Sequence, residues 1–206
     1  MLVTTITCHC SARVDIDVPD PMDIDKDPLL FKQLQEGSFL TCVCPLCGAT
    51  LRPELKVRLK STSRGVDALV VPEMDRLAVY RGKYDAPKGT EILVGYAELF
   101  ERARMLRDEL EARTVEIIKY YLLSRAEEQE PEADIVVLYH GLVNHKLEFH
   151  ILGMKSGETG IIQLPRESAD KSAMAIAKQE PRFKELFASQ YRSIRRLGFL
   201  DDGELD

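Results

Sequence analysis

No stretch of this 206-residue sequence approaches the roughly 18 to 20 consecutive apolar residues that a membrane-spanning helix needs. The amino terminus also lacks a basic segment followed by a long apolar core, which is the pattern of a secretory signal peptide. Positive charge is in deficit too, since the net charge is −6 and the isoelectric point is about 5.4. We therefore expect a cytoplasmic protein without a membrane span. The charge argues against nucleic-acid binding by the whole surface, although it leaves room for a local basic patch.

The familiar catalytic motifs are missing as well. The sequence has no glycine-rich phosphate loop, no G-x-S-x-G turn and no H-E-x-x-H helix, so it indicates no enzyme class. Its composition is that of an ordinary folded protein, with 45% hydrophobic and 30% charged residues. This length suits one large domain or two small ones.

Cysteine is scarce, but its placement is the most informative feature of the chain. All 5 cysteines lie in the first quarter of the sequence, and clustered cysteines in a chain without a secretion signal indicate a metal rather than disulfides. The run from Cys44 to Gly48 has the form of a zinc knuckle, in which a proline fixes the backbone, amide groups point at sulfur and a glycine takes a positive φ. With an upstream pair, the sequence predicts one structural zinc site formed by Cys8, Cys10, Cys44 and Cys47.

Two substitute ligands and one other chemistry remain open. Cys42 is two residues from Cys44 and could replace Cys10, or it could be a buried apolar residue; His9 is the other substitute. The spacing of Cys44 and Cys47 also matches a thiol-redox site. Such a site requires its first cysteine at a helix N-terminus, and no helical pattern follows Gly48.

The first half of the chain predicts short strands around one short helix. Residues 13–18 alternate apolar and charged side chains, so we expect a strand that pairs with residues 2–7. Asp27 is a good N-cap before Pro28, and Gly37 would end that helix. The metal site would then lie at the end of an antiparallel sheet, whose further strands are expected in residues 39–44, 51–59, 66–71 and 77–80.

The second half changes to a helical period and then to a hairpin. From about residue 92 the pattern predicts one long helix, or two helices joined near residues 108–114. A turn at Asn144 and His145 follows a polar linker. The remaining expected elements are strands 135–143, 146–152 and 160–164, helices 167–179 and 182–196, and an acidic tail. The prediction is an α+β protein: a zinc-stabilised antiparallel β domain (residues 1–91), a helical region with a β-hairpin and C-terminal helices (92–200), and the tail (201–206).

Three histidines recur in this hairpin at intervals of five residues. Regular pairing around the turn would place His140 opposite Phe149 and Tyr139 opposite His150, so His140 and His150 would face opposite sides of the sheet. His145 would lie in the turn. We therefore expect ordinary sheet and turn histidines rather than a metal site.

The last segment combines cations with an apolar stripe. On a helix, Phe183, Phe187, Tyr191 and Ile194 would share one face. That face could dock on the protein's own core, or it could serve as an exposed helix or basic patch for a protein or RNA partner. The candidate interaction residues are Arg182, Lys184, Arg192, Arg195 and Arg196.

The order of these features resembles the bacterial CpXC domain family, whose function is uncharacterised. The shared features are Cys8, the helix start at Asp27, and the run from Cys44 to Gly48, and the similarity extends to the arginine-rich region after Gly95. Members of that family begin with a C-x-x-C pair, whereas this chain has Cys8-x-Cys10, so the second ligand departs from the pattern. The resemblance implies a zinc site and the fold, and it implies no activity.

These observations favour a non-enzymatic zinc-binding protein that acts as a protein-interaction or scaffolding module. The expected cofactor is structural zinc, and the expected partner is a protein. The alternatives are an RNA-binding zinc protein that uses the basic C-terminal segment, and a thiol-redox protein that uses Cys44 and Cys47.

Overall fold

The computed structural model describes residues 2–179 and 181–197, and it shows an α+β protein with two compact units. The boundary between the units lies between Phe100 and Glu101, whereas the sequence pattern placed a domain boundary at residue 91. The acidic tail, residues 201–206, lies outside the described residues.

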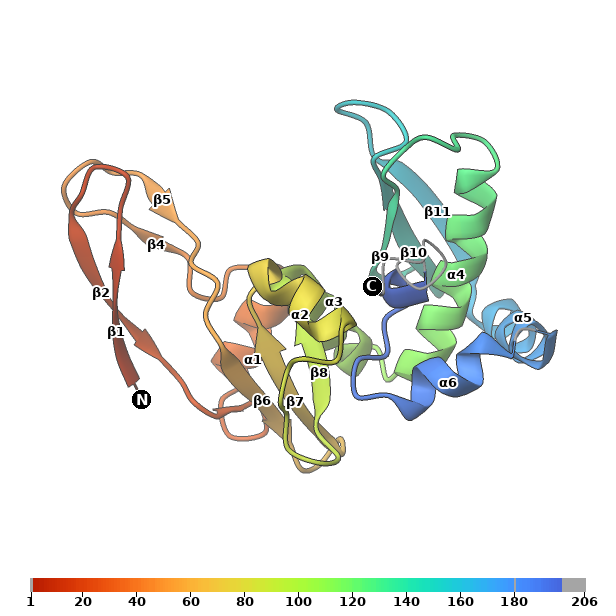
Figure 1. Ribbon diagram of the computed structural model, residues 1–206, viewed down its shortest axis with the longest axis horizontal. Helices are drawn as coiled ribbons and strands as arrows, with labels where there is room; N and C mark the ends of the chain where they lie inside the picture. Colours follow the sequence, from red (N-terminus) through yellow and green to blue (C-terminus); the bar gives the residue numbers. More distant parts are fainter. Residues whose placement is uncertain (1, 180, 198–206) are drawn as a thin grey trace. The chain divides into compact units, whose positions relative to one another are not determined.

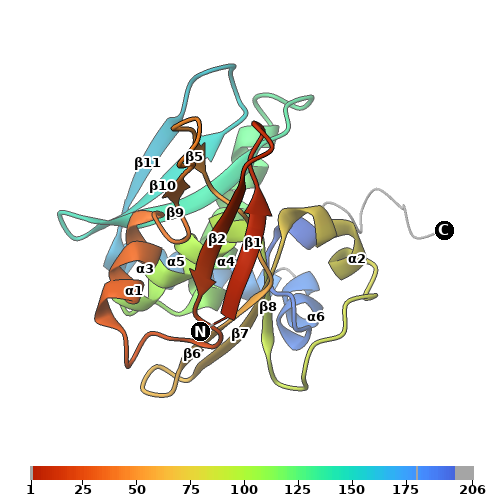
Figure 2. The same cartoon turned by 90° about the vertical axis from the view of Figure 1, so that its left-hand side faces the viewer.

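The first unit contains two small hairpins, one at the start of the chain and one at residues 42–51 (Figure 1), and Figure 2 shows the two strands of the first hairpin, β1 and β2, side by side. Strands β1 and β2 pair antiparallel over their full length, as residues 2–7 and 13–18 were expected to do. Strands β4 and β5 are only two residues long and form a separate two-stranded sheet, so the expected single sheet through residues 39–44 and 51–59 is wrong. The bounds are Leu2–Thr7 for β1, Arg13–Val18 for β2, Cys42–Val43 for β4 and Thr50–Leu51 for β5.

A mixed four-stranded sheet, in the order β3-β6-β7-β8, carries the apolar core of the first unit. The central pair β6 and β7 is antiparallel, whereas β3 with β6 and β7 with β8 are parallel. Leu59, Ala68 and Val70 have no exposed surface. The strands are β3 (Met22–Asp23), β6 (Val57–Ser61), β7 (Val66–Val71) and β8 (Glu91–Val94).

Helix α1 (Pro28–Glu36) begins and ends where its capping residues predict. The Asp27 side chain accepts a hydrogen bond from the Leu30 amide at 2.9 Å, which satisfies one of the free amides of the first turn. Gly37 ends the helix at a φ of 73°, in the left-handed region that glycine enters without strain. Leu30 and Leu34 are the buried residues of this helix.

Residues 77–80 are not a strand. They belong to helix α2 (Arg76–Tyr80), which follows the short 3-10 turn η1 (Glu73–Asp75). Strands β7 and β8 are parallel neighbours, so the chain must cross over between them, and parallel crossovers usually contain a helix. Four apolar residues carry too little periodicity to distinguish the two structures.

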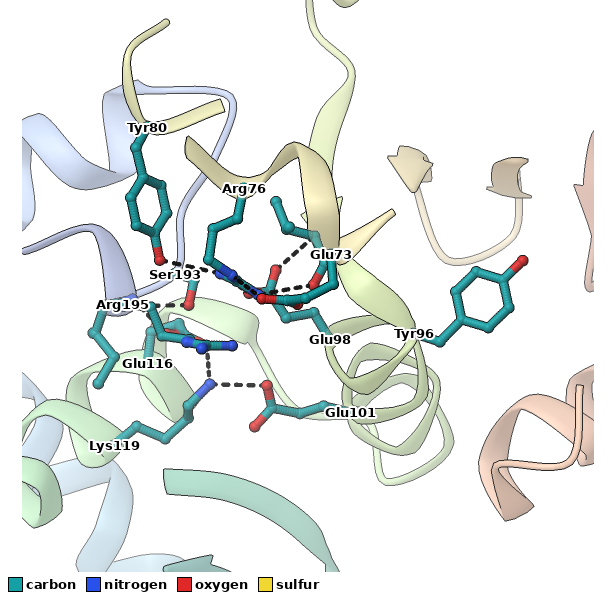
Figure 3. Close-up of polar contacts among 12 residues, drawn as sticks. Glu73, Arg76, Tyr80, Tyr96, Glu98, Glu101, Glu116, Lys119, Ser193 and Arg195 are labelled. Carbon is teal, nitrogen blue, oxygen red and sulfur yellow. Dashed lines mark hydrogen bonds and ion pairs between the residues drawn. The ribbon is translucent and has the colours of Figure 1, made fainter. Parts of the chain in front are cut away.

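Strand β8 was absent from the sequence prediction, and helix α3 (Gly95–Arg107) follows it directly. Arg76, whose side chain is 11% exposed, joins these elements: its Nη1 donates to Glu98 Oε1 at 3.0 Å, and its Nη2 donates to Glu73 Oε2 at 2.7 Å (Figure 3). The other Glu98 oxygen accepts the Val94 amide at 2.8 Å. One carboxylate therefore ties α2, β8 and the first turn of α3 together.

The second unit packs helices against a three-stranded antiparallel sheet in the order β11-β10-β9 (Figure 1). Helix α4 contributes Val115, Ile118 and Leu122 to a core that also contains Tyr139 and Phe149. A break at residues 108–111 separates α3 from α4, so the two-helix alternative is the one observed. The elements are α4 (Ala112–Glu127), β9 (Val136–Val143), β10 (Lys146–Leu152), β11 (Gly160–Pro165), α5 (Arg166–Gln179) and α6 (Arg182–Ala188).

The hairpin of β9 and β10 contains a bulge that the sequence did not reveal. Asn144 and His145 have φ values of 49° and 62°, the two positive angles of a type I′ turn, so the turn is where it was predicted. Beyond Glu148, which pairs with Gly141, the register shifts and Phe149 pairs with Tyr139. His140 is the extra residue, and every pairing beyond it moves by one position relative to the regular ladder.

The expected long helix over residues 182–196 is also wrong, because α6 ends at Ala188 and Ser189 is extended. Tyr191 and Ile194 are nevertheless buried. The Ile194 amide donates to Glu116 Oε2 at 2.8 Å, so a buried carboxylate satisfies this amide just before a further helical turn at residues 195–197.

The second unit contains a buried ion network of Glu101, Glu116 and Lys119 (Figure 3). Lys119, whose side chain is 2% exposed, donates to Glu101 at 2.8 Å and to Glu116 at 2.7 Å. The remaining Glu101 oxygen accepts the Tyr139 amide at 2.6 Å. Burial raises the pKa of Glu101 to about 7 although Lys119 opposes the shift. Burial lowers the pKa of Lys119, but the two carboxylates outweigh it and raise that pKa.

Replacement of Lys119 by methionine should destabilise the protein strongly. The Lys119→Met variant leaves two buried carboxylates without their cation, which typically costs about 3 to 5 kcal/mol. Arg125→Met is the matched control, because Arg125 lies on the same helix with a side chain that is 61% exposed and an ion pair with Glu128 at 3.5 Å. Denaturant unfolding of both variants measures the difference. Equal stability of the two variants would contradict the central role of Lys119.

Candidate metal centre

The two cysteine turns have nearly the same backbone hydrogen-bond pattern. In the first, the Cys8 amide donates to the Ala12 carbonyl at 2.9 Å and the Cys8 carbonyl accepts the Ser11 amide at 2.8 Å. In the second, the Cys44 amide donates to the Ala49 carbonyl at 2.8 Å and the Cys44 carbonyl accepts the Gly48 amide at 2.9 Å. Ser11 and Gly48 have positive φ values of 68° and 72°. Both segments therefore reverse direction in tight turns that present their thiols at the hairpin tips.

The tips of the two hairpins bring four sulfur atoms together. Cys8 Sγ lies 3.6 Å from Cys47 Sγ, Cys10 Sγ lies 3.7 Å from Cys44 Sγ, and all four sulfurs lie within 4.8 Å of one another. A disulfide would require about 2.05 Å, and all five cysteines are free. Sulfurs bonded to one tetrahedral zinc at about 2.3 Å lie about 3.8 Å apart. The cluster therefore has dimensions compatible with one metal ion.

Backbone amides, burial and the neighbouring thiols shift the pKa values of Cys44 and Cys8. The amides of Cys47 and Leu46 point at Cys44 and lower its pKa to about 6. At Cys8 the Cys10 amide acts in the same direction, but burial and the neighbouring thiols outweigh it and raise the pKa to about 12. Cys44 thus ionises more readily than Cys8, and a cation that binds here would displace the proton that Cys8 retains.

Cys42 lies outside this cluster. It pairs with Leu51 in the β4–β5 ladder and, together with Ile16, Leu30 and Phe39, lines a groove in the first unit. His9 lies beside the cluster, with Nδ1 at 3.5 Å from Cys8 Sγ. The structure thus brings together the four cysteines that the sequence singled out.

The surroundings of Cys44 differ from those of a thiol-redox site. In that site the first cysteine begins a helix, whose dipole favours the thiolate. Here a turn and then strand β5 follow Cys44. The shortest sulfur–sulfur distances also join different hairpins rather than Cys44 and Cys47.

The candidate basic patch lies along and beyond α6. Arg182 donates to the Tyr120 hydroxyl at 2.6 Å and its guanidinium lies over that ring, whereas Lys184 is exposed. Arg192 donates to the Ser189 carbonyl at 3.2 Å. The apolar residues of the segment, including Phe183, belong to the core of the second unit, so an exposed groove-binding helix is not what the chain forms. The remaining cations, Arg195 and Arg196, are half-buried.

Sequence reasoning missed a pair of histidines. The rings of His140 and His150 stack at 3.9 Å with an interplanar angle of 12°, so the expectation that they face opposite sides is wrong. The bulge at His140 is the reason. It shifts the pairing by one residue, so that His150 pairs with Leu138 instead of Tyr139 and lies on the same side of the sheet as His140. Gly141, directly after His140, is a sequence sign of a bulge, because glycine inside a strand often marks one.

Comparison with known proteins supports the family suggested by the cysteine pattern. The family model described as CpXC protein matches residues 6–119, which include all five cysteines and both cysteine turns. An uncharacterised protein of Treponema pallidum (strain Nichols) is 26% identical over 212 residues, covering 93% of this chain and 97% of that protein. No solved structure matches the chain. Within the described residues, no helix is long and apolar enough to cross a membrane.

Mild oxidation of the metal-free protein should join the two hairpins. The short distances predict disulfides between Cys8 and Cys47 and between Cys10 and Cys44, with Cys42 left as a free thiol. Peptide mapping by mass spectrometry under non-reducing conditions identifies the links. A predominant link between Cys44 and Cys47, or one that contains Cys42, would contradict the arrangement of the cluster.

Proposed function

The chain belongs to the CpXC family, and from the four thiols of the matched segment we propose that it is a non-enzymatic zinc protein. In this proposal Cys8, Cys10, Cys44 and Cys47 hold one zinc ion, and the zinc-bound hairpins form part of a protein-interaction or scaffolding module. The observation that carries the proposal is that thiols from two separate hairpins meet at the spacing of a tetrahedral site.

The donor set favours zinc. A tetrahedral site of four sulfurs is typical of zinc or of iron–sulfur chemistry, and the 3.6 and 3.7 Å separations suit a single ion with bonds of about 2.3 Å. Thiols remain free for metal in a reducing compartment, so we place the protein in the cytoplasm.

Four protein ligands would leave no open coordination position, which is the property of a structural rather than a catalytic zinc site. The hairpins need such support. Strands β4 and β5 have two residues each, and isolated two-stranded hairpins are marginally stable in water. Zinc binding by small structural sites supplies about 10 to 16 kcal/mol of folding free energy at neutral pH, which is ample to hold both tips.

Exposed apolar side chains next to the cluster support an interaction role. Leu46, inside the second cysteine turn, is 73% exposed, and Val43, beside Cys44, is 62% exposed. Apolar surface that gathers beside a metal-bound turn suits contact with a protein. The groove that Ile16, Leu30 and Phe39 line lies in the same unit and offers further apolar surface.

Loss of a ligand should remove the zinc. Purified wild-type protein is expected to contain one zinc per chain, with four thiols protected until a chelator is added. Cys44→Ser and Cys47→Ser should lose the metal and unfold at lower denaturant concentration, because metal binding and folding are coupled. Cys42→Ser is the matched control and should retain zinc. Elemental analysis with thiol titration measures both; metal-free wild type, or equal zinc loss in Cys42→Ser and Cys10→Ser, would refute the ligand set.

The interaction role has its own test. Leu46→Ser should retain zinc but lose a protein partner that co-purifies with the wild type, because the substitution removes exposed apolar surface and no ligand. Leu77→Ser is the control, as Leu77 is also in the first unit and is 53% exposed. Quantitative co-purification after nuclease treatment and a high-salt wash is the measurement. A complex that is lost with nuclease or rising salt would instead indicate RNA binding through the basic C-terminal segment.

A further inference from the structure

The bulge in β9 changes which side chains share a face of the second unit's sheet. His140 is the unpaired residue, and it brings its ring onto that of His150 in the neighbouring strand β10. The two imidazoles are nearly parallel with centroids 3.9 Å apart. His140 is exposed and His150 is half-buried, so solvent reaches the pair.

A carboxylate completes the group. Glu148 lies two residues before His150 on β10, and its Oε1 is 3.1 Å from His150 Nε2. The other oxygen, Oε2, accepts a hydrogen bond from Gln163 Nε2 at 2.8 Å, across the β10–β11 ladder. One nitrogen from each histidine and one oxygen of Glu148 all lie within 4.8 Å of one another.

The scaffold behind the group is rigid. The amide of Tyr139, directly before the bulged residue, donates to the buried Glu101, which Lys119 holds from its other side. Tyr139 and Phe149 lie beneath the bulge with no exposed surface and contact each other edge to face. The bulge, and with it the position of His140, is therefore fixed by the core.

We propose that His140, His150 and Glu148 form a second metal site, which binds a divalent transition-metal ion such as Zn²⁺ or Ni²⁺. Two imidazoles and a carboxylate are ligands that such ions share, and Gln163 holds the carboxylate as supporting groups do in established sites. The ion pair of Glu148 with His150 explains the position of one histidine only, whereas a shared metal ion explains why all three side chains lie together.

This site differs in kind from the thiol cluster. Its three protein ligands leave at least one coordination position for water or an added ligand, which four thiolates would not. The cations Arg104 and Arg107 lie close enough to His140 to oppose a bound cation, and Glu148 supplies one negative charge that favours it.

The experiment is a titration of the full-length, zinc-loaded protein with further Zn²⁺, and separately with Ni²⁺. Calorimetry measures the binding, and nitrogen-detected NMR monitors the imidazole signals. The chain has 4 histidines. A further equivalent should bind, and the signals of His140 and His150 should shift while those of His9 and His145 do not. Loss of a supporting partner already weakens metal sites by about 10- to 100-fold, so His140→Ala and His150→Ala should lose at least about that much affinity.

His145→Asn is the matched control. His145 is on the same hairpin, and asparagine tolerates its φ of 62°, so this variant removes an imidazole without disturbing the turn. It should bind the additional metal as the wild type does. Denaturant unfolding checks that the alanine variants are folded, as expected for exposed and half-buried positions. No additional binding in the wild type, or undiminished binding in folded His140→Ala and His150→Ala, would overturn the proposal.

Discussion

Isolated hairpins as small as β4–β5 are at best marginally stable in water, so the contact between the tips of the two cysteine turns is important for both hairpins. The four thiols are placed at that point, and each turn uses its own backbone to aim them. The amide groups around Cys44 lower the pKa of its thiol, whereas burial and the neighbouring thiols raise the pKa of Cys8. The four-thiol cluster therefore depends both on the local shape of each turn and on the contact between the two turns, because each turn supplies only two of the four thiols.

In the second unit, a buried ion network joins segments that are distant in the sequence. Glu101, Lys119 and Glu116 lie on helices α3 and α4, and their spare hydrogen-bonding capacity goes to two backbone amides, those of Tyr139 and Ile194. One amide belongs to the bulged strand and the other to the segment after α6. Buried charge is costly to desolvate, and here it serves groups that regular secondary structure leaves unpaired. These two hydrogen bonds tie irregular parts of the unit to helices α3 and α4.

Where local chemistry dominates, the sequence was sufficient. The alternation in residues 13–18, the caps of α1 and the turn at Asn144 all appear in the structure at their predicted positions, because each depends on neighbouring residues alone. The four clustered cysteines were also visible, since a knuckle carries its own signature. The failures were non-local. Residues 77–80 lie in the crossover between the parallel strands β7 and β8, and beyond α6 the Ile194 amide donates to Glu116 instead of to a helical carbonyl. Gly141 is a local sign of the bulge, but no pattern within the strand records that the Tyr139 amide beside it donates to Glu101, 38 positions earlier than Tyr139.

The two proposed metal sites divide the possible roles of metal in this protein. An ion held by four thiolates would have no free coordination position. It could contribute to function only through the surface that it holds in place, including Leu46. An ion held by His140, His150 and Glu148 would keep a free position on a solvent-facing sheet. Soft thiolates and borderline imidazoles also differ in the metals they favour, so the two sites need not compete for the same ion. Any ligand chemistry of a bound metal would therefore belong to the second unit, and recognition of a protein partner to the first.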